Sequence, residues 1–219
     1  MLTDLQREIR RILTGLAECA EFALAGGTAI IVNGIADRPT NDLDFFTSYP
    51  KTVEALLNAA QAALEDEGFD VARLAEGATF ARLSVNNAGE MTYVDLASDA
   101  RMLPARLTEE GFVLAEPELA ADKVLALAGR RESRDYIDFR GLLDRFDIDR
   151  LCELAGDKDP GFAPDQLTDA LGYFDRIPAT EFADYTDDYT GLSECVHAAR
   201  QALQPPAREQ PGRRRGLGL

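Results

Sequence analysis

The sequence is poor in histidine and cysteine, and both shortages restrict the chemistry that it can support. Its 219 residues include a single histidine, His197, and three cysteines. His-based acid–base catalysis, a His–Cys zinc site and a Ser-His-Asp triad therefore lack their residues. The cysteines are scattered without metal-ligand spacing, which favours free thiols. Neither a GxGxxG nor a GxxxxGK[ST] motif is present, so the dinucleotide-fold and P-loop classes are excluded.

Positive charge is also scarce. The chain has 23 Lys and Arg against 39 Asp and Glu, which gives a net charge of 23 − 39 = −16. This balance argues against a broadly basic nucleic-acid surface, although a local basic patch is compatible with an acidic average. The charged N-terminus has no signal-peptide core, and no apolar run approaches membrane-spanning length. We therefore expect a cytoplasmic protein without a membrane partner.

Hydrophobic periodicity predicts an α/β (α+β) first half and a helical second half. Helices are expected at 3–20, 28–33 and 52–67, and strands at 22–25, 42–47, 69–74, 79–85, 91–96 and 112–115. Further helices are expected at 118–130 and 133–146, with two or three more up to residue 204. The predicted organisation is a core over 1–116, a helical domain over 117–204 and a flexible tail over 205–219, which is rich in Pro, Gly and Arg.

Two aspartates in one predicted strand are the first candidates for chemistry. Asp42 and Asp44 are two residues apart, so their side chains point to the same side of the strand. Partly buried carboxylates require neutralisation, and Mg²⁺ is commonly held by one or two carboxylates together with substrate phosphates. An exposed edge strand with solvated acids is the alternative. Asp95 would complete a three-carboxylate cluster if its strand is adjacent, and a structural role for it is equally open.

A glycine turn precedes this strand. Gly26 and Gly27 lie between a short strand and a helix, where they allow the backbone to approach a phosphate, and Thr28 adds a hydroxyl. Such turns alone often only connect elements. Together with the two aspartates, the turn favours nucleotidyl transfer.

A second charged group lies in the helical half. Lys123 is one of only three lysines, and a lysine suits a triphosphate as a point-charge partner. Asp135 and Asp138 are spaced i,i+3 and therefore share a helix face. Pairing of these acids with Arg131 and Arg134 is the structural alternative.

The segments GGTAI, RPTNDLDFF and PELAADKVLALAGRRESRDYIDF, taken together, resemble the nucleotidyltransferase superfamily and its AbiEii/AbiGii toxin branch, which includes the MenT toxins. The resemblance spans roughly residues 20–146. It implies a minimal polymerase-β-like core with a mixed sheet, followed by a C-terminal helical bundle. It also implies an NTP substrate, Mg²⁺ (with Mn²⁺ as an alternative), a tRNA acceptor and a cognate antitoxin encoded nearby.

The resemblance also implies roles for individual residues. The phosphate turn would be Gly26, Gly27 and Thr28, the substrate-binding residues Arg38, Thr40, Lys123 and Asp135, the metal ligands Asp42, Asp44 and Asp95, and the catalytic set Asp42, Asp44, Lys123 and Asp138. Asp138, or else Asp135, would complete the site, and Asp95 occupies the third-carboxylate position.

The leading hypothesis is a Mg²⁺-dependent nucleotidyltransferase toxin that transfers NMP from an NTP to a tRNA 3′ end and releases pyrophosphate. The acidic net charge leaves two other acceptors open, a protein hydroxyl and an aminoglycoside-like small alcohol, because acidic clefts attract cationic molecules. A non-catalytic member that only binds a nucleotide or an antitoxin is the remaining alternative.

Overall fold

The computed structural model describes residues 1–204, and the predicted flexible tail at 205–219 lies outside the described residues. The strands are β1 (Ala23–Leu24), β2 (Asp42–Thr47), β3 (Asp70–Glu76), β4 (Phe80–Asn87), β5 (Glu90–Ser98), β6 (Arg106–Thr108) and β7 (Gly111–Val113). The α-helices are α1 (Asp4–Thr14), α2 (Gly26–Val32), α3 (Val53–Asp66), α4 (Glu116–Arg130), α5 (Ser133–Leu143), α6 (Ile148–Lys158), α7 (Pro164–Tyr173) and α8 (Tyr189–Ala202). Short 3₁₀ turns lie at Ala17–Glu21, Pro50–Thr52, Phe174–Arg176 and Ala179–Phe182.

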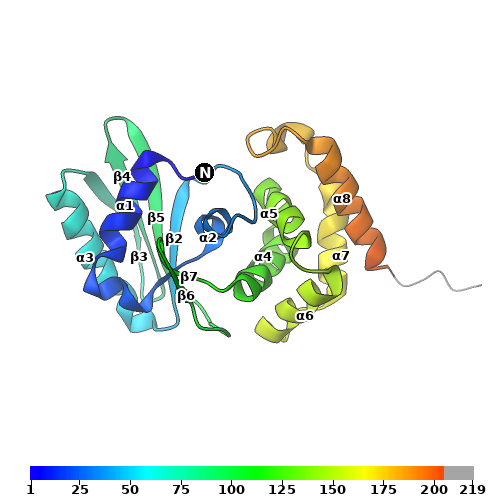
Figure 1. Ribbon diagram of the computed structural model, residues 1–219, viewed down its shortest axis with the longest axis horizontal. Helices are drawn as coiled ribbons and strands as arrows, with labels where there is room; N and C mark the ends of the chain where they lie inside the picture. Colours follow the sequence, from blue (N-terminus) through cyan, green and yellow to red (C-terminus); the bar gives the residue numbers. More distant parts are fainter. Residues whose placement is uncertain (205–219) are drawn as a thin grey trace, which may run out of the picture.

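The strands form one mixed sheet in the order β3-β4-β5-β2-β1-β7-β6. β2 pairs with β5 in parallel and with β1 in antiparallel orientation. The sheet occupies one half of the molecule and α4 to α8 the other, with α2 between them (Figure 1). The predicted α+β fold with a mixed sheet and a following helical region is confirmed.

Most element predictions agree with the structure, and the differences have local causes. The helix expected at 3–20 ends at Thr14, because Gly15 caps it and a 3₁₀ turn follows. Its start is as expected, since the Thr3 hydroxyl accepts the Gln6 N–H at 3.2 Å. Strand β6 was not predicted, because it has only three residues and two of them are exposed.

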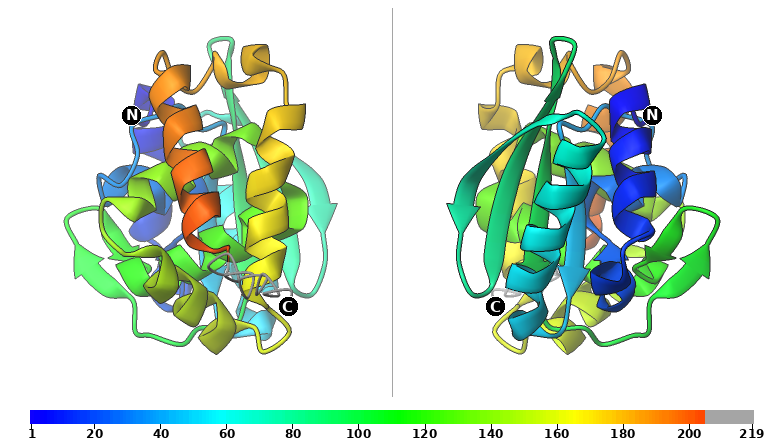
Figure 2. Two further views of the ribbon diagram at one scale, coloured as in Figure 1. Left: turned by 90° about the vertical axis from the view of Figure 1, so that its right-hand side faces the viewer. Right: turned by 90° about the vertical axis from the view of Figure 1, so that its left-hand side faces the viewer.

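α1 and α3 cover one face of the sheet, as the right-hand view of Figure 2 shows. Strands β4 and β5 turn alternate residues inward against these helices, among them Leu83, Val94 and Leu96. The apolar core continues from the sheet through α4 into the helical half. No helix within residues 1–204 is long and apolar enough to cross a membrane.

Lys158 ties the two halves together at the far end of α6. Its ammonium group contacts Glu118 at 2.8 Å, Asp99 at 3.0 Å and Asp122. Asp99 follows β5, whereas Glu118 and Asp122 belong to α4. The nearly buried lysine therefore joins the sheet half to two helices of the other half.

A close backbone contact fixes α5 against the loop that leads to β2. A Cβ atom at Gly141 would lie 2.1 Å from the Ile35 carbonyl oxygen, and a separation that short is sterically forbidden. Glycine at this position therefore allows α5 to approach the loop that carries Arg38.

We predict that Gly141→Ala lowers the free energy of unfolding by about 1–3 kcal/mol, because the added methyl forces backbone apart. This loss opposes the gain of up to about 1 kcal/mol that alanine normally gives within a helix. Gly156→Ala in α6 is the matched control, since the described residues place no atom within 4 Å of its added Cβ apart from its chain neighbours and the backbone of its own helix. Chemical denaturation should show the control to be as stable as the wild type or more stable. Equal stability of both variants would contradict the close contact.

Candidate active site

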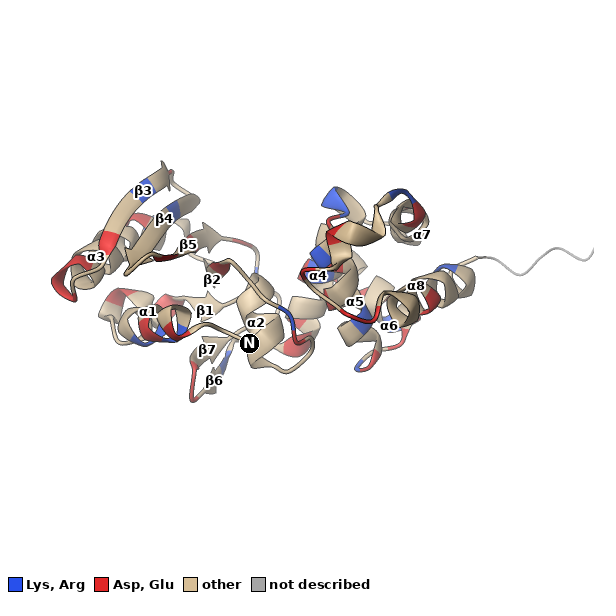
Figure 3. Cartoon of the chain, turned by 90° about the horizontal axis from the view of Figure 1, so that it is seen from above, with Lys and Arg blue, Asp and Glu red and all other residues tan. Residues whose placement is uncertain are grey.

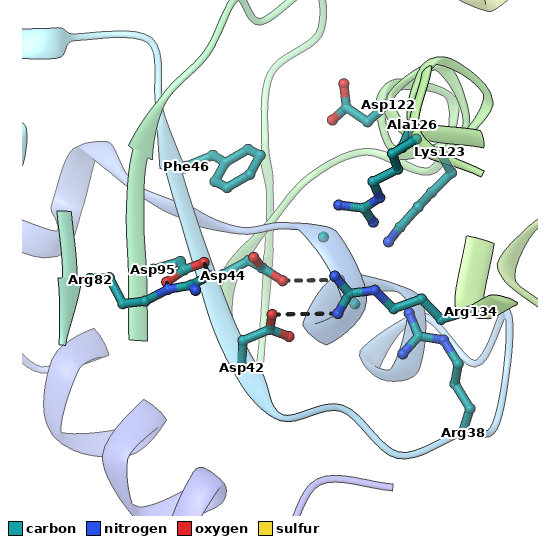
Figure 4. A pocket seen from close by; sticks show the side chains of 13 residues that line it. Arg38, Asp42, Asp44, Phe46, Arg82, Asp95, Asp122, Lys123, Ala126 and Arg134 are labelled. Atoms are coloured by element: carbon teal, nitrogen blue, oxygen red, sulfur yellow. Dashed lines mark hydrogen bonds and ion pairs between the residues drawn. The ribbon is translucent and has the colours of Figure 1, made fainter. Parts of the chain in front are cut away.

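Three carboxylates meet where β2 and β5 run side by side. Asp42 and Asp44 project from the same side of β2, and Asp44 lies opposite Asp95 in the parallel register. One oxygen atom from each of the three carboxylates lies within 4.8 Å of the others (Figure 4). The condition under which Asp95 joins the cluster, a strand adjacent to that of Asp42, is thus met.

Each carboxylate is held by a different element. An oxygen of Asp42 accepts the Thr40 hydroxyl at 2.7 Å, and Oδ2 of Asp44 accepts the Gly27 N–H at 3.0 Å. Asp95 accepts two hydrogen bonds from the Arg82 guanidinium, one of them from Nε at 2.6 Å. The cluster is therefore orientated from the preceding loop, from α2 and from β4.

The close approach of these acids affects the pKa of Asp44. Burial, together with the negative charges of Asp42 and Asp95, raises the pKa of Asp44 to about 7, although Lys123 and the Gly27 N–H act in the opposite direction. Ionisation of Asp44 beside the negative charge of Asp42 is therefore costly unless a cation is added. The site thus has the electrostatic character of a cation site.

The glycine turn is pressed against this cluster. Gly26 has a φ of +51°, and a Cβ there would lie 2.1 Å from the Asp44 carboxylate, so that only glycine fits. Thr28 is fully buried; its hydroxyl donates to the Asp42 carbonyl and accepts the Asp44 N–H, both at 3.2 Å. The turn therefore sets the position of β2 from one side.

Asp138 of α5 lies at the centre of a buried group of charges. It accepts hydrogen bonds from Arg38 Nε at 2.6 Å and Nη2 at 2.7 Å, and its Oδ2 lies 2.8 Å from Lys123 Nζ. Burial alone would raise the pKa of Asp138, but Lys123 and Arg38 outweigh it, and the pKa lies below its ordinary value. One carboxylate thus holds two cations beside the cleft.

Asp135 has a comparable role one turn earlier. It is fully buried and accepts hydrogen bonds from Arg130 at 2.7 and 3.0 Å and from the Glu132 N–H at 3.1 Å. The alternative in which Arg131 and Arg134 pair with the two α5 acids is wrong. Both acids face inward, whereas Arg134 reaches across the cleft to within 3.7 Å of Asp42.

The carboxylate cluster forms one wall of a cleft between β2 and α4. The cleft is lined by Gly26, Gly27, Arg38, Asp42, Asp44, Phe46, Arg82, Asp95, Asp122, Lys123, Ala126, Arg130 and Arg134. Five of these residues are basic and four are acidic, in a chain where acids outnumber bases. The remaining predicted site residues, Thr28, Thr40, Asp135 and Asp138, lie behind this lining.

Sequence reasoning missed several lining residues, chiefly Arg82, Phe46, Arg130 and Asp122. Phe46 could have been found, because it continues the two-residue spacing of Asp42 and Asp44 on the same face of β2. Arg82 is on the outward side of β4. Its position opposite Asp95 depends on the strand register, which the hydrophobic pattern of the sequence does not determine.

The donor set suits a hard divalent cation. Three carboxylates converge, and Mg²⁺ prefers oxygen ligands. Asp95 can still contribute, because an ionised carboxylate has about four acceptor sites and Arg82 uses two of them. The residues present therefore fit the metal that the resemblance implies.

Comparison with known proteins gives a family and a fold. Residues 11–204 match the family model described as nucleotidyl transferase AbiEii toxin, type IV toxin–antitoxin system. MenT4, a nucleotidyltransferase toxin from Mycobacterium tuberculosis, has a similar structure at 18% identity, a TM-score of 0.57 and coverage of 93% of this chain and 90% of MenT4. JHP933 from Helicobacter pylori is similar at 19% identity and a TM-score of 0.56, with 93% of each chain covered. No curated protein matches in a sequence search.

We predict that Asp138→Asn lowers the free energy of unfolding at pH 7 by about 3–5 kcal/mol, because two buried cations lose their counter-ion. The pKa of Asp138 is lowered from 3.8, so its stabilising contribution is present above pH 3.8 and is lost as the pH falls through the folded pKa. The variant should therefore lose less stability on acidification than the wild type. Denaturation at several pH values measures both effects.

Asp144→Asn is the matched control, since Asp144 caps the same helix and is exposed. Its free energy of unfolding should stay within about 0.5 kcal/mol of the wild type. An Asp138→Asn protein that behaves like this control would refute the charge-holding role.

Proposed function

We propose that this chain, which belongs to the AbiEii family of nucleotidyl transferase toxins, transfers a nucleoside monophosphate from an NTP to the 3′ hydroxyl of a tRNA. The observation that carries the proposal is the position of the Asp42, Asp44 and Asp95 carboxylates opposite Lys123, Arg130 and Arg134 across one cleft. Acids for a metal and cations for phosphates are the two parts that phosphoryl transfer requires.

Asp42, Asp44 and Asp95 would hold Mg²⁺, or Mn²⁺ in its place. The metal, when bound, supplies positive charge that stabilises the transferring phosphoryl group. Thr40 and Gly27 keep the first two carboxylates in place through the hydrogen bonds described above. Thr28 ties Asp42 to Asp44 through the backbone. These three residues are positioning residues for the acids.

Lys123, Arg130 and Arg134 bind the triphosphate from the α4 and α5 side, with the Gly26–Gly27 turn below it. Asp138 fixes the direction of the Lys123 ammonium, and Asp135 fixes Arg130. Arg38 shares Asp138 with Lys123 and lines the same cleft. Fixed cations of this kind stabilise charge that develops in the transition state without a reorganisation cost.

In the reaction, the 3′ hydroxyl oxygen of the acceptor forms a bond to the α-phosphorus. The bond from that phosphorus to the α,β-bridging oxygen breaks, and pyrophosphate leaves. The hydroxyl proton passes to water. The products are pyrophosphate and an RNA that is one nucleotide longer. A cognate antitoxin encoded beside the toxin would prevent this modification in the cell.

We predict that the protein, incubated with Mg²⁺, total tRNA and each α-labelled NTP in turn, attaches label to tRNA with at least one NTP. Asp42→Ala and Asp44→Asn should each reduce this transfer by about 100-fold or more, because loss of even an outer-shell partner of a metal costs 10–100-fold. Asp66→Asn, an exposed acid on α3 at the opposite face of the sheet, is the matched control and should leave the rate unchanged.

Absence of transfer with all NTPs, or equal transfer by Asp42→Ala, would refute nucleotidyl transfer at this site. Label on the protein itself, on a partner protein or on an aminoglycoside instead of tRNA would refute the tRNA acceptor and retain the chemistry. Nucleotide binding without pyrophosphate release would indicate the non-catalytic alternative.

A further inference from the structure

We infer that the outward face of β4 and β5 is the acceptor platform, on which the unpaired bases at the 3′ end of the RNA stack. The platform is formed by Phe80, Arg82 and Tyr93. This inference rests on the proposed function, and it adds the surface that holds the acceptor and the type of nucleic acid that this surface accepts.

The three side chains form a continuous layer beside the carboxylate cluster. In the antiparallel register of β4 and β5, Arg82 lies opposite Asp95, while Phe80 and Tyr93 lie two residues away along each strand. The Arg82 guanidinium carbon is 5.8 Å from the Phe80 ring centroid and 5.4 Å from the Tyr93 ring centroid. Its two hydrogen bonds to Asp95 fix the plane of the guanidinium.

This layer is open to a ligand. Phe80 is 40% exposed, the Arg82 side chain is 38% exposed, and Tyr93 is half-buried. Between β4 and β5 the opposing residues are small, with Ala97 opposite Phe80 and Ser84 opposite Tyr93, and on the β2 side Tyr93 lies opposite Asp42. α1 and α3 pack on the other face of the sheet, on the left in Figure 3, with the helical half on the right. A planar group can therefore lie on the rings without displacing a helix.

The in-line geometry of phosphoryl transfer places the acceptor on the Arg82 side of the carboxylates. The attacking and leaving oxygens lie roughly in line through the transferred phosphorus. Figure 4 shows Lys123 and Arg134 on one side of the carboxylates and Arg82 on the other. If the leaving pyrophosphate is held by Lys123 and Arg134, the attacking hydroxyl must approach from the side of Arg82. The acceptor chain then continues onto Phe80 and Tyr93.

The chemistry of the platform fits a single-stranded nucleic acid. Unpaired bases stack on aromatic rings and on arginine guanidinium planes, and this stacking tolerates any base. A base-paired helix shows its backbone and groove edges and offers no free base faces. Arg82, which lines the cleft and lies between the two rings, supplies positive charge beside the phosphates of the terminal nucleotides. The stacking surface and the positive charge beside it therefore both favour an unpaired 3′ end as the occupant.

The test uses Phe80→Ala, Tyr93→Ala and the double variant, with Tyr93→Phe to retain the ring. Phe112→Ala is the matched control, because Phe112 is also 40% exposed but lies on β7 at the other end of the sheet. Two quantities are measured: the KM for tRNA in the transfer assay, and the affinity for a fluorescent single-stranded RNA by anisotropy. NTP binding without RNA reports on the rest of the site.

We predict that each alanine variant raises the KM for tRNA and the dissociation constant for RNA by about tenfold, with a larger effect in the double variant. Tyr93→Phe should restore most of the RNA affinity, and Phe112→Ala should match the wild type. NTP affinity should not change in any of these variants, because neither ring is among the residues that line the cleft. A duplex that ends without an overhang should bind the wild type more weakly than the single strand.

Failure of the inference and failure of the proposed function give different results. Wild-type transfer with an unchanged KM in the double variant would overturn the platform alone. Weaker RNA binding by the alanine variants, in a protein that transfers no nucleotide, would support the platform and refute the proposed reaction. Equal RNA affinity of the wild type, the double variant and the Phe112 control would overturn the platform regardless of turnover.

Discussion

Three carboxylates on two adjacent strands repel one another on one wall of the cleft, and the elements around them compensate for this repulsion. Asp42, Asp44 and Asp95 have oxygens within 4.8 Å of one another. Charges that close together in a partly buried site are costly unless they are compensated. Compensation comes from a loop hydroxyl, a backbone N–H of α2 and a guanidinium on β4. Each of these elements is therefore placed by its relation to the carboxylates.

On the opposite side of the cleft, a buried group of charges contains more basic than acidic side chains. Asp138 is shared by Arg38 and Lys123, so this buried group carries one positive charge more than its acid neutralises. Such an ion pair is weak evidence for net stability, because its desolvation cost offsets much of the attraction. Its structural effect is positional: it joins the loop before β2 to α4 and α5. The excess positive charge then lies beside the acidic cluster, where the proposed metal and triphosphate would require both signs of charge.

The parts of the site that depend on local pattern could be predicted, and the parts that depend on register could not. The two-residue spacing of Asp42 and Asp44 places both acids on one face of a strand, whatever the tertiary structure. The scarcity of lysine made Lys123 a candidate before the resemblance gave it a role, and Lys123 lines the same cleft. The pairing of Arg82 with Asp95 needs the alignment of β4 with β5, and charge alone does not determine it. The helices of the second half were likewise predicted from periodicity, whereas the three-residue strand β6 is too short to show one.

The distribution of charge is compatible with the RNA acceptor that we propose for this acidic protein. The chain has a net charge of −16, yet five of the nine charged residues that line the cleft are basic. Sequence-independent affinity for nucleic acid grows with the number of phosphates that a surface neutralises. A small basic cleft neutralises few phosphates, and the acidic exterior repels the remainder of the RNA. Affinity then has to come from contacts at the terminal nucleotides, where the phosphates meet the cleft and unpaired bases can stack. If the acceptor is RNA, as we propose, an acidic surface around a cleft with a small excess of basic residues favours recognition of an RNA end over recognition of an extended duplex.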